Sequence, residues 1–188
     1  SGIRRMAHLD TSSYETKIAG YIDDEKIDPL WEDKKSKSRM DRITLFSLIT
    51  AEMAWKNSGL NQLEMPEWRK GIIVGTGCGT AQTAEYSYER FFAQRNPFVK
   101  PTTVPRGMFN APAGEIGIRY GLTRVSNTVT TACSSGLTAI ALADLYIRAG
   151  MADIILVGGV DCPIHQAYYH IWDSLRVMTR DFNDEPER

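Results

Sequence analysis

The segment 126–161, SNTVTTACSSGLTAIALADLYIRAGMADIILVGGVD, constrains the fold of this chain more than any other. Residues 126–131 are rich in β-branched side chains, which is typical of a short buried strand. Apolar residues then recur at helical spacing from Leu137 up to Gly150, and a second apolar run, 154–157, ends at two glycines. A strand, a helix and a second strand in this order predict two parallel strands that pair with each other through a right-handed crossover.

Cys133 lies at the predicted turn from the first strand into the helix, among small residues. The N-terminus of a helix carries unpaired backbone N–H groups and a partial positive charge. A thiol in such a position commonly has its pKa lowered to ~3.5–7.5 from ~8.5, and the same N–H groups can hold an oxyanion. The residue is therefore either a nucleophilic thiol or a buried structural cysteine, and its position alone slightly favours the second interpretation.

The residues around Cys133 match the active-site segment of a known enzyme family. TTACSSG, the helix after it and ADIILVGGVD closely resemble that segment of the β-ketoacyl-acyl carrier protein synthases, above all the synthase II-like branch of the thiolase superfamily. Further motifs occur in the order and spacing of that family: SGIRRM, YETKIAGYI, SRMDRIT, IIVGTGCGT and NAPAGEIGIRYGL. The resemblance therefore covers essentially the whole chain.

The resemblance implies an α/β fold of the thiolase-like class, in which residues 1–188 form part of the N-terminal β-ketoacyl synthase module. The sheet of that module is mixed but largely parallel, with helices on both faces. Relative to the family, the first strand and the C-terminal module are expected to be missing from this sequence.

By the same resemblance, Cys133 is the catalytic nucleophile of an acyltransferase, a 3-oxoacyl-[acyl-carrier-protein] synthase of fatty-acid or polyketide biosynthesis. It accepts an acyl group, which then condenses with malonyl-carrier as carbon dioxide leaves. No cofactor is implied, because the partner, acyl carrier protein, brings the substrates on phosphopantetheine. A homodimer that pairs through residues 126–131 is implied as well. Three residues are implied to lie near the acyl tunnel, although plain core packing suits them equally: Ala84, Met108 and Phe109.

Other catalytic groups of the family lie outside this sequence. Two histidines, a lysine and one oxyanion-hole N–H belong to the family's C-terminal half, so residues 1–188 alone are expected not to catalyse condensation. His165 and His170 are interpreted as ordinary histidines, because a spacing of five residues does not place both on one helical face. Two alternatives remain open. One is a catalytically silent partner subunit or scaffold fragment, which typically has glutamine in place of Cys133. The other is a cysteine hydrolase, which needs a base near the thiol.

Composition narrows the class of protein further. The net charge of −1, with both signs mixed, indicates neither a nucleic-acid nor a membrane partner, and no apolar run approaches the ~20 residues of a membrane span. Three cysteines fit a reducing cytosol, so a cytoplasmic location is expected, and three histidines leave little material for a metal site. One basic cluster either attracts an acidic carrier protein or is a solvated loop that enters the next helix: Lys34, Lys35, Lys37 and Arg39.

The rest of the sequence predicts the remaining elements. The GTGCGT after the first buried strand departs from the G-x-G-x-x-G phosphate motif, so it indicates a tight turn with close backbone packing. Asp161 stands where many family members carry Glu, a departure with no clear chemical consequence. Irregular chain is predicted over 1–36, apart from an edge strand at 17–22, and a loose, charged tail is predicted over 181–188. Periodicity and proline content predict helices over 39–57, 81–93 and 108–120, a strand over 71–75 and an extended loop over 96–105.

Overall fold

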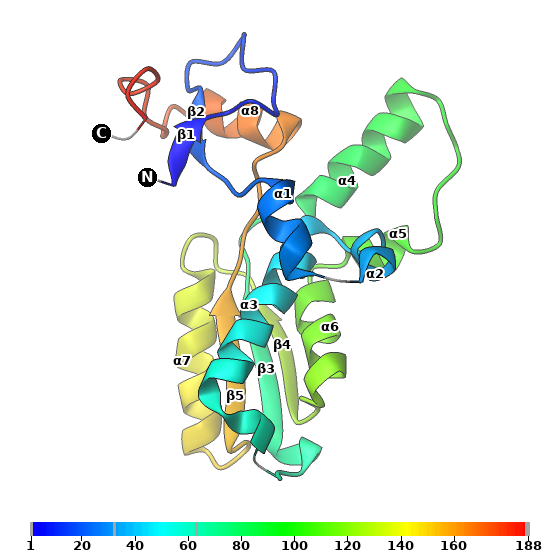
Figure 1. The fold of residues 1–188 in the computed structure, drawn as a ribbon, viewed down its shortest axis with the longest axis vertical. Coiled ribbons are helices and arrows are strands. Elements are labelled where there is room, and N and C mark those ends of the chain that lie inside the picture. The colour runs from blue at the N-terminus through cyan, green and yellow to red at the C-terminus, as the bar shows by residue number, and fades with distance from the viewer. Residues whose placement is uncertain (1, 32, 63, 187–188) are drawn as a thin grey trace. The chain divides into compact units, whose positions relative to one another are not determined.

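The computed structural model describes residues 2–31, 33–62 and 64–186, and the chain divides into two compact units. The larger unit spans residues 33–162, and the smaller unit combines residues 1–32 with residues 163–188. Figure 1 shows the helices and strands of both units. Within the described ranges, none of the helices has the length and apolar character needed to cross a membrane.

The larger unit is built on a three-stranded parallel sheet in the order β4-β3-β5 (Figure 1). β3 (Lys70–Gly75) lies in the centre, with β4 (Val125–Val129) and β5 (Ile154–Gly159) on either side. The last residue of β3 pairs with the last residue of each neighbour, so the three strands end at the same edge of the sheet. The three predicted strands are confirmed. The prediction that β4 and β5 pair with each other is wrong, because β3 lies between them.

Helices cover both faces of this sheet, because the side chains of a strand alternate between its two faces. On one face, Ile73 of β3 packs with Ala139 of α7 (Ser135–Arg148) in an apolar core. On the other face lies α6 (Ala111–Tyr120), with α3 (Arg42–Ser58) packed against it. The predicted α/β architecture of a parallel sheet between helices is confirmed.

α3 matches the helix predicted over 39–57, and its ends show how the sequence sets its length. Asp41 caps the N-terminus by accepting a hydrogen bond from Ile43 N at 3.1 Å, and Gly59 ends the helix with a φ of +72°. The buried Asp41 carboxylate also accepts bonds from Thr83 N at 2.9 Å and Thr83 Oγ1 at 2.5 Å, which joins α3 to the next helix. The buried residues of α3 lie between Ile43 and Ala51.

The segment between β3 and β4 follows the predictions with two corrections. α4 (Ala81–Tyr88) continues into a π-helical turn, η4 (Glu89–Ala93), which confirms the predicted helix. The predicted extended loop is wrong at its end, because α5 (Thr103–Gly107) is helical; its proline lies in the first turn, where a missing N–H costs nothing. α6 begins at Ala111, three residues later than predicted. Shorter turns complete the larger unit: α2 (Lys34–Lys37), η2 (Leu60–Gln62) and η3 (Glu67–Arg69).

In its described residues, the smaller unit contains a two-stranded antiparallel ribbon, one longer helix and two short helical turns. β1 (Ile3–Arg5) pairs with β2 (Ile18–Gly20), which confirms the predicted strand at 17–22. Met6 and Tyr14 form a small core with Tyr169, which α8 (Gln166–Ser174) contributes. The region predicted to be irregular is therefore more ordered than expected, and it also contains two short helical turns: α1 (Asp24–Ile27) and η1 (Asp28–Leu30).

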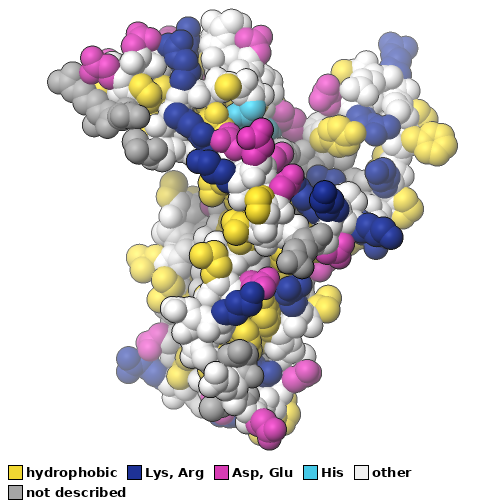
Figure 2. All heavy atoms as spheres, viewed as in Figure 1, with side chains coloured by type: hydrophobic (Ala, Val, Ile, Leu, Met, Phe, Trp, Pro, Cys, Tyr) yellow, Lys and Arg dark blue, Asp and Glu magenta, His cyan; other side chains and the backbone are white. Residues whose placement is uncertain are grey.

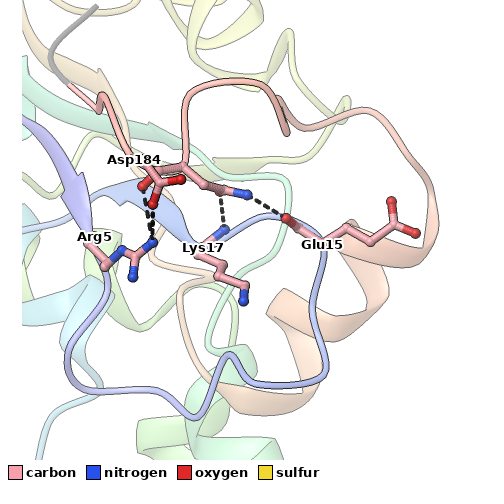
Figure 3. A network of polar contacts seen from close by, with 5 residues as sticks. Arg5, Glu15, Lys17 and Asp184 are labelled. Carbon is pink, nitrogen blue, oxygen red and sulfur yellow. Dashed lines mark hydrogen bonds and ion pairs between the residues drawn. The ribbon is translucent and has the colours of Figure 1, made fainter.

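Polar contacts tie the C-terminal tail to the N-terminal ribbon within the smaller unit, as Figure 3 shows. Arg5 donates a hydrogen bond to Asp184 Oδ1 at 2.7 Å. The backbone N–H of Lys17 donates to Asn183 Oδ1 at 2.8 Å. The prediction of a loose tail is therefore wrong for residues 181–186, and the last two residues lie outside the part of the chain that is described.

Candidate active site

Cys133 lies in the sharp turn between β4 and α7, and its side chain is exposed. The residue before it, Ala132, has a φ of +53°, a backbone conformation that residues other than glycine rarely adopt. Such outliers persist where the surrounding structure holds them in place, and they gather at functional sites. The predicted strand-to-helix turn is confirmed, and it presents an accessible thiol at the N-terminal end of a 14-residue helix.

Hydroxyl groups hold this turn from within. Ser135 Oγ accepts a hydrogen bond from Thr131 N at 2.9 Å and donates one to Ala132 O at 2.6 Å. Ser134 is the N-cap residue of α7, but its hydroxyl makes no capping bond and donates instead to Thr131 O at 2.7 Å. Thr131 Oγ1 lies 2.8 Å from Thr138 Oγ1, one turn into the helix. The two residues before Cys133 are thus bonded to α7 and to its N-cap residue.

Glycines let the ends of the strands approach the start of α7 closely. A Cβ atom built on Gly75 would lie 2.2 Å from Ser135 O, and one built on Gly159 would lie 2.8 Å from Gly136 Cα. A Cβ on Gly77 would lie 3.2 Å from Ala132 O. The interpretation of GTGCGT as a turn with close backbone packing is therefore confirmed, and Gly159 of β5 permits a similar close contact with the start of α7.

Asp161 fastens the loop after β3 to the end of β5. Its Oδ1 accepts hydrogen bonds from Thr76 Oγ1 at 2.9 Å, Gly77 N at 3.1 Å and Cys78 N at 2.7 Å. Sequence reasoning did not predict this role of Asp161, whose carboxylate orders the loop that borders Ala132. A signal was present in the sequence. Asp161 and the glycine loop 75–79 each follow a predicted strand, and the ends of parallel strands meet at one edge of a sheet, which brings the two segments together.

The other two cysteines lie in environments that suppress their reactivity. Burial raises the pKa of the Cys78 thiol, and the nearby Asp161 and Cys133 raise it further. Burial raises the pKa of Cys162 to about 12. Because the thiolate is the nucleophile, neither residue is suited to attack a carbonyl at neutral pH. The geometry is consistent with Cys133 as the reactive thiol, an assignment that stays a prediction.

The three residues predicted near an acyl tunnel lie on the segment between β3 and β4. Ala84 is exposed on α4, and Met108 and Phe109 follow α5, each with 48% of its surface exposed. The Phe109 ring lies so close to Gly79 that a Cβ on that glycine would meet the ring at 2.6 Å. Phe109 thus borders the loop that Asp161 fastens, and the tunnel assignment of all three residues stays a prediction.

The two weighed histidines belong to the smaller unit. His165 is buried immediately before α8, and the ring of His170 lies 5.4 Å from that of Tyr14, centroid to centroid. Their interpretation as ordinary histidines stays a prediction. Among the described residues, no three His, Cys, Asp or Glu side chains gather as a metal site requires.

Comparison with known proteins identifies the family of this chain. The family model "Beta-ketoacyl synthase, N-terminal domain" matches residues 1–188. The chain is 30% identical over its whole length to the 3-oxoacyl-[acyl-carrier-protein] synthase 2 of Coxiella burnetii (strain RSA 493 / Nine Mile phase I), of which it spans 45%.

Solved structures show the same fold. A β-ketoacyl synthase from Burkholderia phymatum STM815 superimposes with a TM-score of 0.79 at 19% identity, over 98% of this chain and 45% of that one. A second structure is that of a type II PKS acyl-carrier protein in complex with its ketosynthase bound to the hexaketide. It superimposes with a TM-score of 0.76 at 22% identity, over 93% of this chain and 41% of that one. With a thiolase-like ketosynthase fold and a family model that matches from end to end, the chain belongs to the β-ketoacyl synthase family and carries its N-terminal domain.

Proposed function

We propose that this chain is the acyl-accepting part of a 3-oxoacyl-[acyl-carrier-protein] synthase of fatty-acid or polyketide biosynthesis. The observation that carries the proposal is the exposed thiol of Cys133 on a strained turn at the start of α7. The Cys133 thiol loses its proton and its sulfur attacks the carbonyl of a carrier thioester; the bond from that carbonyl carbon to the phosphopantetheine sulfur breaks, and the leaving thiolate takes up a proton. A cysteine-bound acyl group and a free carrier thiol result.

Condensation follows on the same sulfur. Malonyl-carrier loses carbon dioxide, and the electron pair of the broken bond forms an enolate, whose carbon attacks the acyl carbonyl on Cys133. The thiolate leaves, and 3-oxoacyl-carrier is released. The resemblance assigns two histidines and a lysine to this step, in the part of the relatives that this chain does not span. The chain's own contribution is therefore the nucleophile and the shape of its turn.

Acyl carrier protein is the partner in this proposal, because the larger unit presents basic side chains that suit an acidic protein. α2 carries three basic residues, Lys34, Lys35 and Lys37, and a fourth, Arg39, lies two residues beyond the end of the helix. A cavity of about 300 Å³ nearby in the same unit contains three more and no acidic residue among its lining: Arg90, Lys100 and Arg106. Figure 2 shows Lys and Arg side chains gathered over α2, α4 and α5.

The proposal includes a homodimer and a cytoplasmic location. β4 is an edge strand, so one side of it is available to pair with a second copy across a two-fold axis. Large apolar side chains are exposed on the segment between β3 and β4, as an interface requires: Phe91, Phe92, Phe98, Val104, Met108 and Phe109. The cytoplasmic location continues to rest on cysteine usage.

The test uses the complete protein that contains this chain, with acyl-carrier and malonyl-carrier as substrates. Mass spectrometry should find the acyl group on the peptide that contains Cys133, and Cys133→Ala should abolish both the adduct and the 3-oxoacyl product. Cys162→Ala is the matched control and should keep both. An adduct elsewhere, or none, would overturn the proposal and favour a catalytically silent partner subunit. Acyl-enzyme that turns over in water without malonyl-carrier would favour a hydrolase.

A further inference from the structure

We propose that Ser135 is a positioning residue, whose hydroxyl holds the turn at Cys133 in its strained form and thereby sets the rate of acyl transfer. The part that concerns acyl transfer rests on the proposed function, whereas the part that concerns the reactivity of the thiol does not. Ser135 touches no reacting atom in this proposal. It acts through Ala132, the residue that adjoins the nucleophile.

The hydrogen bonds of Ser135 span the strained residue. Its Oγ accepts from Thr131 N at 2.9 Å, on one side of Ala132, and donates to Ala132 O at 2.6 Å, on the other. Ala132 O also accepts from Ser135 N at 3.1 Å. The hydroxyl bonds to the two peptide groups on either side of the Thr131–Ala132 peptide, so rotation of the chain at Ala132 would move one bonded atom relative to the other and break a bond.

This arrangement matters because Ala132 does not favour its own conformation. A φ of +53° is uncommon for a residue with a Cβ, and the surroundings must hold it. If Ala132 relaxed to a negative φ, the peptide that joins it to Cys133 would turn. The thiol would then move relative to the N-terminus of α7.

Ser135 is itself fixed, which allows it to serve as the anchor. Only 2% of its surface is exposed. Its backbone carbonyl lies against Gly75 so closely that a Cβ there would approach to 2.2 Å, and the next residue, Gly136, lies against Gly159. The central strand and β5 therefore hold Ser135, and Ser135 holds the turn.

Ser134 provides a matched control in the same turn. It also carries a hydroxyl bonded to the turn, to Thr131 O at 2.7 Å. Its side chain is exposed, however, and its hydroxyl bonds to Thr131 alone, with no bond to Ala132. The backbone N–H of Ser134 also donates to Thr131 O at 3.2 Å, and this bond remains when the hydroxyl is lost. Loss of the Ser134 hydroxyl should therefore leave the conformation of Ala132 in place.

The experiment compares Ser135→Ala, Ser134→Ala, Ala132→Gly and the double variant Ala132→Gly/Ser135→Ala in the complete protein. Two rates are measured per folded molecule: alkylation of Cys133 by iodoacetamide, and acyl transfer from acyl-carrier to Cys133 as separate kcat and KM. Thermal unfolding is followed alongside. Ser135→Ala should lower the kcat of acyl transfer and the alkylation rate by about tenfold, with KM within about twofold, because a small displacement of a nucleophile is costly. Ser134→Ala should change either rate by less than about twofold.

The double variant separates positioning from a purely structural role. Glycine adopts a positive φ without strain. Adding Ala132→Gly to Ser135→Ala should therefore recover at least half of the decrease in each rate, measured on a logarithmic scale. The proposal is overturned if Ser135→Ala changes neither rate, if its loss equals that of Ser134→Ala, or if glycine at 132 restores nothing. Should Ser135→Ala fail to fold, Ala132→Gly and the double variant are compared directly, and a tenfold gap between them overturns the proposal. If wild-type protein transfers no acyl group, the proposed function fails, and the alkylation rates still decide the role of Ser135.

Discussion

Gly75 and Ser135 meet backbone to backbone: a Cβ atom built on the glycine would lie 2.2 Å from the carbonyl oxygen of the serine. This contact joins the end of the central strand to the first turn of the helix that follows Cys133. Gly159 and Gly136 make a similar contact between β5 and the same turn, at 2.8 Å from the built Cβ to the Cα. The position of the nucleophile is therefore set by packing that only glycines permit.

Gly75→Ala should destabilise the larger unit, because the methyl group has no space against Ser135 and backbone must move. Overpacking of this kind typically costs about 1–3 kcal/mol, and urea unfolding of the complete protein measures it. Gly114→Ala is the control, since a Cβ at Gly114 in α6 would meet no atom within 4 Å and alanine favours a helix. The idea of a packing constraint would be contradicted if both variants unfolded at the same urea concentration.

Cys133 should be alkylated first when the complete protein is treated with limiting iodoacetamide at pH 7. Burial raises the pKa of Cys78 and raises that of Cys162 to about 12, so both remain thiols at this pH. Raising the pH to 9 should increase labelling of Cys162 only slightly, since its pKa lies well above 9. Peptide mapping reports the three sites, and preferential labelling of Cys78 or Cys162 would count against the assignment of Cys133.

Asp161→Asn should loosen the loop 76–78 and raise the reactivity of Cys78. The carboxylate accepts three hydrogen bonds from this loop, and a lost bond to a charged group costs about 1.5–3 kcal/mol. Removing its charge also lowers the pKa of Cys78, which burial raises first and Asp161 second. Urea unfolding and the alkylation rate of Cys78 at pH 8 measure the two effects.

The matched variant Asp161→Glu keeps the charge, so its Cys78 should react more slowly than that of Asp161→Asn. Equal rates in the two variants would show that the charge of residue 161 does not act on this thiol.

Residues 1–188 by themselves should not catalyse condensation. Stabilisation of the enolate by positioned donors is commonly worth ~10²–10³ in rate for each donor, and the resemblance assigns those donors to the part of the relatives that the chain does not span. Carbon dioxide release from malonyl-carrier is measured with the 188-residue chain and with the complete protein at equal concentration. A comparable rate from the short chain would mean that a base within these residues had been overlooked.

Exposed apolar side chains on α7 should make the 188-residue chain associate in solution. Leu137 and Leu145 of this helix are 71% and 60% exposed, respectively. Light scattering should show larger species than a monomer at micromolar concentration. Replacement of both leucines by Gln should reduce the association, and a monomer before substitution would contradict the prediction.

The sequence by itself determined the kinds of element and the place of Cys133. β-branched runs, helical spacing and glycine stops are local signals, and each reflects the conformation of a few neighbouring residues. They located β3, β4, β5, α3 and α7 within a few residues, and they located the turn between β4 and α7. The family motifs around that turn then indicated the chemistry, because TTACSSG is a combination of residues and not a single feature.

Tertiary structure decided which elements are neighbours and what holds the site. The insertion of β3 between β4 and β5 depends on contacts between residues far apart in sequence, which periodicity does not encode. The bonds from Asp161 to the loop 76–78 likewise join the ends of two strands about eighty residues apart, and they exist only once the sheet has formed. The role of Ser135 also depends on the folded structure, because in the sequence Ser135 is only a small polar residue at the start of a predicted helix. Its role appears only when the glycines of two strands fix it beside the strained Ala132.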